Sequence, residues 1–384
     1  MRLVLDAAYP NRMSYLEDWR SHWMAQKDQK SLYINIARLT SLNRNRRLIE
    51  SADQIVVLHS CTADTNNWLK PYINSLARRK GTLIFFVGNE YSSPTVSMDI
   101  RLKMILEISP DILASQLPIA AAQWIYEDCA KKIASAPQGM PEPIRNPIKK
   151  LDFAYRGFKY PSFILGNQRN VISGAVSQEF RRRGLSSDYS LTQRLSKDAW
   201  MSLLAGTRIT AASEAGSSRV FRSDEVWEPL RKSQEIRLVN SDNAIVHLAR
   251  YLPHGLKSKI RMKISKGKNV YGSLHDDSKS ALLLANQVKN STLPSADGRA
   301  ISSRHFDAIA AGCWQILEEG SYNGLLRPWI DYTPIADGSA IAVKDSVDHA
   351  LEAANSLNIS AMQDRLFEFN SYDHRIKSLI LLLG

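Results

Sequence analysis

Cysteine is scarce in this sequence and shows no pairing pattern. Only Cys61, Cys129 and Cys313 occur among 384 residues, and no CxxC pair is present. Structural zinc sites and disulfide frameworks need closely spaced cysteines, so the sequence argues against both. A small, dispersed set of cysteines is typical of a reducing compartment, and we therefore expect a cytoplasmic protein.

Long apolar runs are also absent. No stretch of about 18 apolar residues occurs, which argues against a membrane-spanning helix. Asp6 falls where a signal peptide would need its apolar core, so we expect no export signal. With 44% hydrophobic and 23% charged residues, a chain of this length can form two globular domains, each with its own core.

Acidic residues are fewer than basic residues, 38 against 50, and the formal net charge is +12. Nucleic acid, an anionic membrane surface or a polyphosphate substrate would each account for this excess. The sequence contains no zinc-finger spacing, no RRM signature and no basic heptad region, which argues against nucleic acid.

A basic segment at residues 255–268 leaves two interpretations open. Its cations Lys257, Lys259, Arg261 and Lys263 alternate with small or apolar residues, so a strand would carry them on one face. One interpretation is docking to an anionic membrane surface, which would make the protein peripheral at the inner face of the membrane. The other is a solvated edge strand that lysines protect against pairing.

The first 136 residues alternate between apolar runs and helical patterns. Strands are expected at residues 2–5, 32–37, 54–60, 82–87, 111–115 and 132–135, and helices at 15–24 and 66–80. This alternation predicts an α/β fold with a doubly wound parallel sheet. Ligands of such sheets bind beyond the carboxyl ends of the strands. The polar residues expected there, each of which could instead be a helix cap or a loop residue, are His59, Ser60, Asp64, Asn89 and Glu90.

Four prolines interrupt residues 137–150 and predict a linker between two domains. We expect one domain at residues 1–145, a second at 150–360 and terminal helices at 361–384. An apolar stripe would pack the last helix against the first domain. The stripe consists of Ile376, Leu379, Ile380 and Leu383.

The second half continues the alternation, with strands expected at 153–155 and 208–212 and a helix at 171–183. That helix ends in three arginines, Arg181 to Arg183, which suit the negative end of the helix dipole, so we interpret them as structural. The loop from Arg156 to Lys159 would bring a glycine and two cations to an anion, although a solvated surface loop fits equally well.

Residues 302–312 predict a short helix that feeds into a buried strand. Ser303 is a suitable N-cap, and Gly312 can take the left-handed conformation that ends the helix. Arg304 at the helix N-terminus would bind an anion together with the free N–H groups, and Asp307, one turn later, could hold ribose hydroxyls. A nucleoside diphosphate fits this arrangement.

The run ISSRHFDAIAAGCWQILEEGSYNGLL, residues 301–326, resembles the donor-binding segment of bacterial glycosyltransferases of the GT-B architecture. It is closest to those of surface polysaccharide synthesis, related to the spore-maturation CgeB-like group. Residues 152–161 and 213–217 are similar to the opening strand and a central loop of the second domain in that family. The resemblance covers residues 150–335 in detail and the first half by pattern alone.

The resemblance implies a GT-B fold, in which two Rossmann-like doubly wound domains are followed by a C-terminal helix that crosses back to the first domain. The first domain would take the acceptor and the second the donor. The implied reaction moves a sugar from a nucleotide-diphosphate sugar to a saccharide or lipid-linked acceptor, in bacterial surface glycan synthesis. No Asp-x-Asp motif is present, so we expect neither a metal nor another cofactor.

Site residues follow from the same resemblance. Arg304 would contact the diphosphate with help from Arg156 or Lys159, and Asp307 would bind ribose. Glu214, in a loop of small residues after a strand, would hold sugar hydroxyls or position the acceptor. The remaining donor-binding residues are Gly216, Ser217, Glu319, Tyr322 and Asn323.

Two departures leave the stereochemistry of transfer open. Retaining relatives often carry two glutamates separated by seven residues, whereas this chain has Arg299 and Asp307 at those positions. If transfer is inverting, a base such as His59, Asp64 or Glu90 must deprotonate the acceptor. Two alternatives to transfer are a nucleotide-sugar 2-epimerase of the same architecture and a non-catalytic nucleotide- or polyanion-binding protein.

Overall fold

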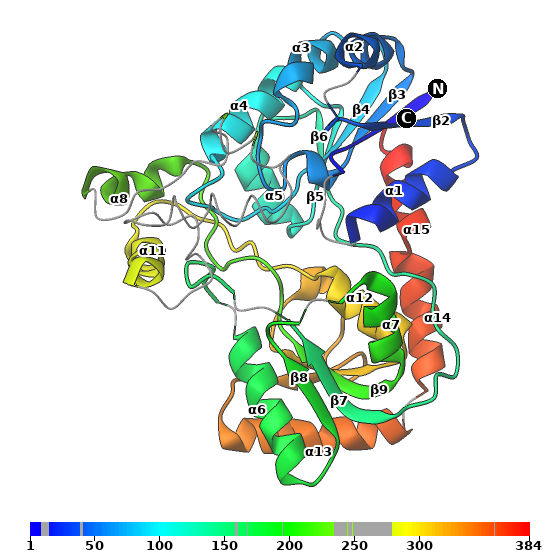
Figure 1. The fold of residues 1–384 in the computed structure, drawn as a ribbon, viewed down its shortest axis with the longest axis vertical. Helices are drawn as coiled ribbons and strands as arrows, with labels where there is room; N and C mark the ends of the chain where they lie inside the picture. The colour runs from blue at the N-terminus through cyan, green and yellow to red at the C-terminus, as the bar shows by residue number, and fades with distance from the viewer. Residues whose placement is uncertain are drawn as a thin grey trace.

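Two parallel β-sheets, one above the other in Figure 1, form the framework of the protein. The computed structural model describes residues 1–8, 15–38, 41–157, 160–166, 168–193, 195–233, 279–356 and 358–384, and within 234–278 only Ala244 and Leu248. The basic segment at 255–268 lies outside the described residues. In the part of the chain that is described, no helix combines the length and apolar composition that crossing a membrane requires.

The first sheet has six strands in the order β2-β1-β3-β4-β5-β6, and all neighbours are parallel. Its strands are β1 (Arg2–Asp6), β2 (Ser31–Asn35), β3 (Gln54–Val57), β4 (Thr82–Phe86), β5 (Ile112–Ser115) and β6 (Lys132–Ser135). Central strands are apolar on both faces because helices cover both faces of the sheet. The helices of this half are α1 (Tyr15–Ala25), α2 (Leu42–Ser51), α3 (Ile73–Ala77), α4 (Met98–Ile108) and α5 (Ile119–Tyr126).

Alternate residues of each strand serve different helices, as the two-residue period of a strand requires. Leu3 and Leu5 belong to the cluster beneath α2 to α5, whereas Val4 packs with Trp19 and Trp23 of α1. The doubly wound sheet expected from the sequence is therefore confirmed.

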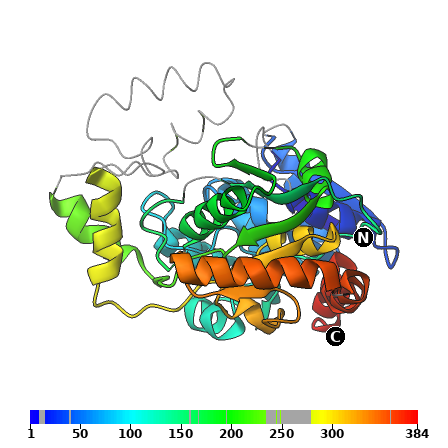
Figure 2. The ribbon, with the colours of Figure 1, turned by 90° about the horizontal axis from the view of Figure 1, so that it is seen from below.

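The second sheet has five parallel strands in the order β11-β10-β9-β7-β8. Its strands are β7 (Leu151–Arg156), β8 (Ser187–Ser190), β9 (Thr207–Ala212), β10 (Trp314–Glu318) and β11 (Thr333–Ile335). The helices around it are α6 (Arg169–Arg182), α7 (Lys197–Ala205), α12 (Ser303–Ala310) and α13 (Ala340–Ser356). In Figure 2, α13 runs in orange across the outer side of this domain.

In both sheets, the order in which the strands are added reverses at the same place. The first strand of each domain lies between the second and third, so the chain switches sides between β1 and β3 and between β7 and β9. In open α/β sheets the ligand crevice lies outside the carboxyl ends of the strands at this switch point.

The carboxyl edges of the two sheets face each other, because loops that follow their strands are in contact. Asn323, after β10, donates to the carbonyl oxygen of Gln116, after β5, at 3.2 Å. The N–H of Phe221, after β9, donates to the Ser92 hydroxyl, after β4, at 2.8 Å. A further segment, with α8 (Glu228–Ser233) and α11 (Lys279–Asn290), lies beside the two domains (Figure 1).

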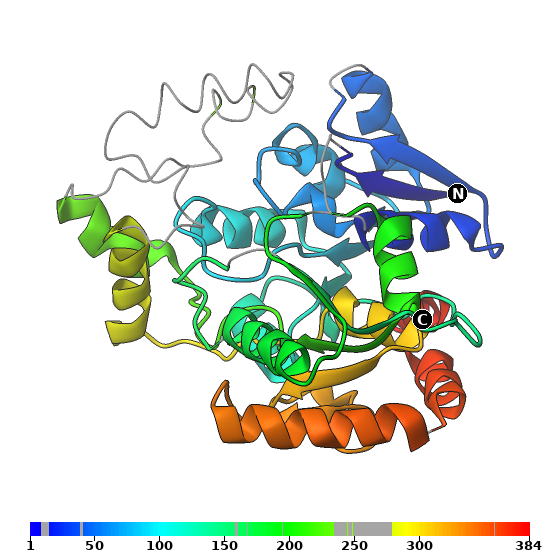
Figure 3. The ribbon, with the colours of Figure 1, turned by 60° about the horizontal axis from the view of Figure 1, so that its bottom comes forward.

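The two C-terminal helices divide between the domains. Met362 and Leu366 of α14 (Ile359–Asn370) pack in the core of the second domain, whereas Ile376 and Leu379 of α15 (Tyr372–Leu381) join the α1 side of the first sheet. Figure 3 shows both helices at one side of the molecule. A helix that crosses back is thus confirmed. Of the two C-terminal helices, α15 packs on the first domain and α14 on the second.

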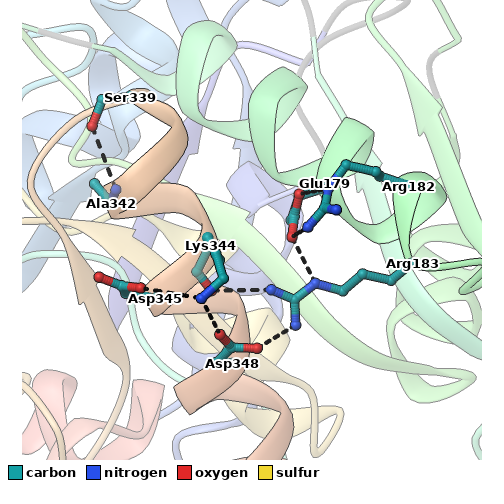
Figure 4. Close-up of polar contacts among 8 residues, drawn as sticks. All are labelled: Glu179, Arg182, Arg183, Ser339, Ala342, Lys344, Asp345 and Asp348. Carbon is teal, nitrogen blue, oxygen red and sulfur yellow. Dashed lines mark hydrogen bonds and ion pairs between the residues drawn. The ribbon is translucent and has the colours of Figure 1, made fainter.

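The arginine run at the end of α6 has a structural role, as the sequence predicted. Arg182 and Arg183 both bind Glu179, one turn earlier, at 2.6 and 2.7 Å. Arg183 also forms an ion pair with Asp348 of α13, next to Lys344 (Figure 4). The run therefore ties α6 to α13.

Three local expectations differ from the structure. The helix predicted at 66–80 is reduced to a 3₁₀ turn, Lys70–Tyr72, and the five-residue α3. α2 and β8 were not expected, since α2 carries three arginines and few apolar residues, and β8 reads Ser-Asp-Tyr-Ser. β8 forms nonetheless because it is an edge strand that pairs with β7.

Shortening the fully buried Ile376 tests the crossing of α15. Ile376→Ala should lower the free energy of unfolding by about 2–5 kcal/mol, because it opens a cavity against the first sheet. Urea unfolding of the variant beside the exposed Lys377→Ala control measures the difference. Equal stability of the two variants would contradict this packing.

Candidate functional site

Arg169 anchors the switch point of the second sheet. It is the first residue of α6 and is buried. Its guanidinium donates to the carbonyl oxygens of Ser213 and Glu214 at 2.8 and 3.0 Å, just after β9, and to the Tyr160 hydroxyl, whose ring it also covers at 4.6 Å. These bonds fix a cation beside the carboxyl ends of β7 and β9.

Arg304 of α12 brings a second cation to the same edge. Its guanidinium lies 5.4 Å from the Tyr155 ring and 5.0 Å from the Trp200 ring, and it donates to the carbonyl oxygen of Arg156 at the end of β7. Burial lowers the pKa of Arg304, and the charge of Arg169 lowers it further. Its contacts are a carbonyl and two rings, and the Asp307 carboxylate offsets part of the lowering. A bound anion would further relieve the repulsion between the two guanidinium groups.

Glu214 holds the loop that follows β10. Its carboxylate accepts the backbone N–H of Tyr322 at 2.6 Å and the hydroxyl of Ser321 at 3.2 Å. Gly320 lies so close that a Cβ there would stand 2.5 Å from the carboxylate. Besides the small residues next to Glu214 in sequence, Gly320 also packs against its carboxylate, and only glycine fits there.

The other predicted residues of this loop have different surroundings. Tyr322 is buried, and its hydroxyl donates to the carbonyl oxygen of Glu318 at 2.6 Å. Asn323 accepts the N–H of Ile301 at 2.8 Å and reaches the first domain through its amide group. The Glu319 side chain is exposed to solvent.

The start of α12 differs by one residue from the expectation. Ser302 rather than Ser303 is the N-cap, and it forms a capping box with His305, whose ring accepts the Ser302 N–H at 3.0 Å. Burial lowers the pKa of His305 to about 3, so the ring is a neutral acceptor. Gly312 ends the helix with a φ of 64°, as predicted.

Asp307 points toward α7 and the first domain. One carboxylate oxygen accepts the indole N–H of Trp200 at 3.1 Å. Lys197, also on α7, pairs with Asp18 of α1, and these two charges act on Asp307 in opposite directions. Burial is the largest effect and raises the pKa of Asp307 to about 7.

The basic loop after β7 is only partly described. Arg156 forms an ion pair with Asp188 of β8 at 2.5 Å, and its side chain is only 11% exposed. This pairing engages the cation that we expected at the diphosphate. Lys159 lies outside the described residues.

Gly216 and Ser217 shape the loop after β9. Gly216 has a φ of 85° and lies against the carbonyl of Gly298, where a side chain would overlap it. The buried Ser217 hydroxyl accepts the N–H of Leu165 at 3.1 Å. Both residues therefore position neighbouring loops.

In the first domain, His59 is a core residue. Its ring is fully buried, 5.5 Å from that of Trp19 and 4.7 Å from that of Phe86. Burial lowers its pKa to about 3. The His59 side chain is not exposed, so a bound substrate could not contact it in this structure.

The remaining first-domain candidates bind one another or nearby loops. Ser60 donates to Asp6 at 2.5 Å, and Asn89 donates to Asp64 at 3.3 Å. Their positions after β3 and β4 are those the sequence predicted.

Glu90 also binds protein groups. It accepts the hydroxyl of Ser115, the last residue of β5, and the N–H of Gln116, both at 2.6 Å. Burial raises its pKa to about 7.

The sequence did not predict Arg169 and Trp200 as residues of the candidate site. A cation in the first turn of a helix opposes the helix dipole, so Arg169 carried a signal that it serves another purpose. Trp200 offered no such signal, because its contact with Asp307 exists only once α7 packs against α12.

Asp307 should make stability depend on pH. Its folded pKa lies above the ordinary value, so the folded state holds a proton between about pH 4 and 7 that the unfolded state releases, and stability falls as pH rises. Asp307→Asn removes this penalty. Its free energy of unfolding relative to wild type should therefore be higher at pH 8 than at pH 4.5 by at least about 1 kcal/mol. Urea unfolding at both pH values measures it, with the exposed Asp198→Asn as control. A constant difference between variant and wild type would contradict the assignment.

Comparisons with known proteins bear on the fold. No protein-family model and no curated protein sequence matches the chain. Among solved structures, the Anabaena protein Alr3699/HepE in complex with UDP has a TM-score of 0.51 at 10% identity, covering 100% of this chain and 99% of that one.

Two further structures are more distant. An α-glucosyltransferase solved with UDP-glucose and DNA containing an abasic site has a TM-score of 0.45 at 8% identity, covering 100% of this chain and 99% of its own. The GtfA/B complex has a TM-score of 0.42 at 11% identity, and the match spans 93% of this chain but only 63% of that one. Together with the two facing parallel sheets and the crossing of α15, the HepE likeness establishes that this chain has the GT-B glycosyltransferase fold.

Proposed function

We propose that the protein is a glycosyltransferase that moves a sugar from a nucleotide-diphosphate sugar to a saccharide or lipid-linked acceptor. The observation that carries this proposal is the meeting of Arg169 and Arg304 at the switch point between β7 and β9. Arg169 is buried and Arg304 is partly buried, and two cations that repel each other away from solvent are costly in a folded protein unless an anion joins them. A diphosphate supplies two adjacent negative groups at the required place.

The chemistry of transfer matches this arrangement. The bond between the anomeric carbon and the diphosphate oxygen breaks, a bond to the acceptor oxygen forms, and the acceptor proton passes to a base. Negative charge grows on the departing diphosphate, and preorganised guanidinium groups stabilise it. Asp307 has one carboxylate oxygen on Trp200 and would offer the other to the ribose hydroxyls. Glu214 would act on the sugar through the loop that it holds.

The likeness to HepE, which was solved with UDP and with UDP and glucose, supports a nucleotide-sugar donor through the shared fold. A role in bacterial surface glycan synthesis and kinship with the CgeB-like group are supported by the sequence resemblance. With His59 fully buried and Glu90 buried and bonded at both carboxylate oxygens, Asp64 is the most exposed of the three proposed bases for an inverting reaction.

The proposal includes membrane docking through the basic segment, supported by its alternation of cations and small or apolar residues. Replacing Lys257, Lys259, Arg261 and Lys263 with glutamine should reduce flotation with anionic liposomes, since each cation near the surface contributes roughly 1 kcal/mol. Neutral liposomes serve as the control. Undiminished flotation of the variant would rule docking by this segment out.

Calorimetric titration with UDP, GDP, dTDP and CMP tests the donor site. One nucleotide should bind saturably, and Arg304→Lys or Asp307→Ala should weaken it at least tenfold, which is about 1.4 kcal/mol. Lysine keeps the charge but loses the planar fork of donors. The matched control is Arg208→Gln, an arginine paired with Asp152 at the opposite end of β9.

The outcomes separate this function from its alternatives. Binding followed by isomerisation of the donor without an acceptor would indicate an epimerase. Binding with neither transfer nor isomerisation would indicate a non-catalytic binding protein. Failure of all four nucleotides to bind would overturn the donor-site assignment.

A further inference from the structure

An open pocket of about 390 Å³, called the cavity below, lies between the two domains. Its first-domain wall is the start of α5, and its second-domain wall is the segment before α12 together with the loop after β10. The lining residues are Pro118, Ala120 and Ala121 on one side and Ala296, Asp297, Arg299 and Ser321 on the other. The volume is at the small end of the range for small-molecule sites, about 300–1,000 Å³.

One wall of the cavity is polar and the other is not. The Arg299 guanidinium forms a fork with Asp297, with contacts of 3.1 and 2.6 Å, and Ser321 adds a hydroxyl. The side chains of Arg299 and Asp297 are 33% and 50% exposed, and an ion pair this exposed contributes at most about 1 kcal/mol, so a ligand can replace it. The opposite wall offers only proline and alanine.

This combination suits a sugar ring, which has hydroxyls along its edge and C–H groups on its face. A carboxylate and a guanidinium in one plane can accept from and donate to neighbouring hydroxyls. Small apolar side chains let a ring face approach closely. Glu214 stands behind the polar wall, since its carboxylate binds Ser321 and the N–H of Tyr322.

The charges around the cavity determine which sugars fit. The pKa of Arg299 is raised by its hydrogen bond to Asp297 and by the charges of Asp297, Glu214 and Glu318. These four side chains comprise one cation and three carboxylates. A ligand with its own carboxylate or phosphate at this position would add a fourth negative group, whereas a neutral ring would not.

We propose that this cavity binds a neutral sugar ring, with its hydroxyls on Arg299, Asp297 and Ser321 and its C–H face on the start of α5. The inference rests on the proposed function and names the class of sugar that it handles. The ring belongs either to the donor or to the acceptor. The polar wall selects it against uronates.

Variants of the cavity test this assignment without touching the two diphosphate arginines. Ala120→Phe fills the cavity from the first domain, and Asp297→Asn removes one of the three carboxylates. The control is Arg222→Gln, which breaks an exposed interdomain ion pair with Glu127 at the far end of α5 and does not line the cavity. Each protein is titrated with the nucleotide selected above, as the free diphosphate and as its glucose and glucuronate conjugates.

If the ring belongs to the donor, wild type should bind the glucose conjugate at least tenfold more tightly than the glucuronate conjugate. If it belongs to the acceptor, transfer to a neutral sugar should exceed transfer to its uronate at least tenfold. Asp297→Asn should reduce that preference at least threefold. Ala120→Phe should leave the affinity for the free diphosphate within twofold. If the ring belongs to the donor, Ala120→Phe weakens the glucose conjugate at least tenfold; if it belongs to the acceptor, donor binding is kept and transfer falls at least tenfold.

Two results would overturn the inference. Nucleotide binding with no response of the sugar conjugate or of transfer to either cavity variant would remove the sugar site and leave the proposed function standing. No nucleotide binding by wild type would remove both.

Discussion

The Glu214 carboxylate is the constraint on which the rest of the cleft depends. Because it is buried and accepts the N–H of Tyr322, it fixes the loop after β10 relative to β9. Its own backbone carbonyl is held by Arg169, so α6 and β9 cannot move apart without uncovering a cation. Through Asn323 the same loop reaches the first domain. One acid therefore sets the positions of a helix, two strands and the domain boundary.

Much of the fold could be predicted because its signal lies in apolar runs. β3 and β4 are buried on both faces, and only a sheet covered on two sides asks for such continuous runs. Elements that are stabilised mainly by contacts with other parts of the chain carry no comparable signal in their own sequence. β8 reads as a polar turn but pairs along β7, and α2 places three arginines in ten residues yet buries Ile49. The segment at 66–80 shows the reverse error, since its helical spacing is interrupted by a 3₁₀ turn.

For the candidate site, local patterns predicted loops at the carboxyl ends of the strands but not the partners of each side chain. Arg304 and Glu214 lie at the ends of β7 and β9, whereas Asp307 contacts Trp200 of α7. Arg156 was expected at an anion and instead pairs with Asp188 of an edge strand that the sequence did not reveal. His59 follows a strand, as catalytic residues often do, but whether it faces the cleft or the core depends on α1, which brings Trp19 over it.

Within the described residues, the chain crosses between the domains near residue 140 and again near residue 370, and the two crossings are bonded to each other. The N–H of Met140 donates to the carbonyl of Asn370 at 2.7 Å, and Met140 pairs with Ser371 in a short parallel bridge. The outgoing and returning connections are therefore tied to each other by a backbone contact. The position of one domain relative to the other depends on both connections at this one junction.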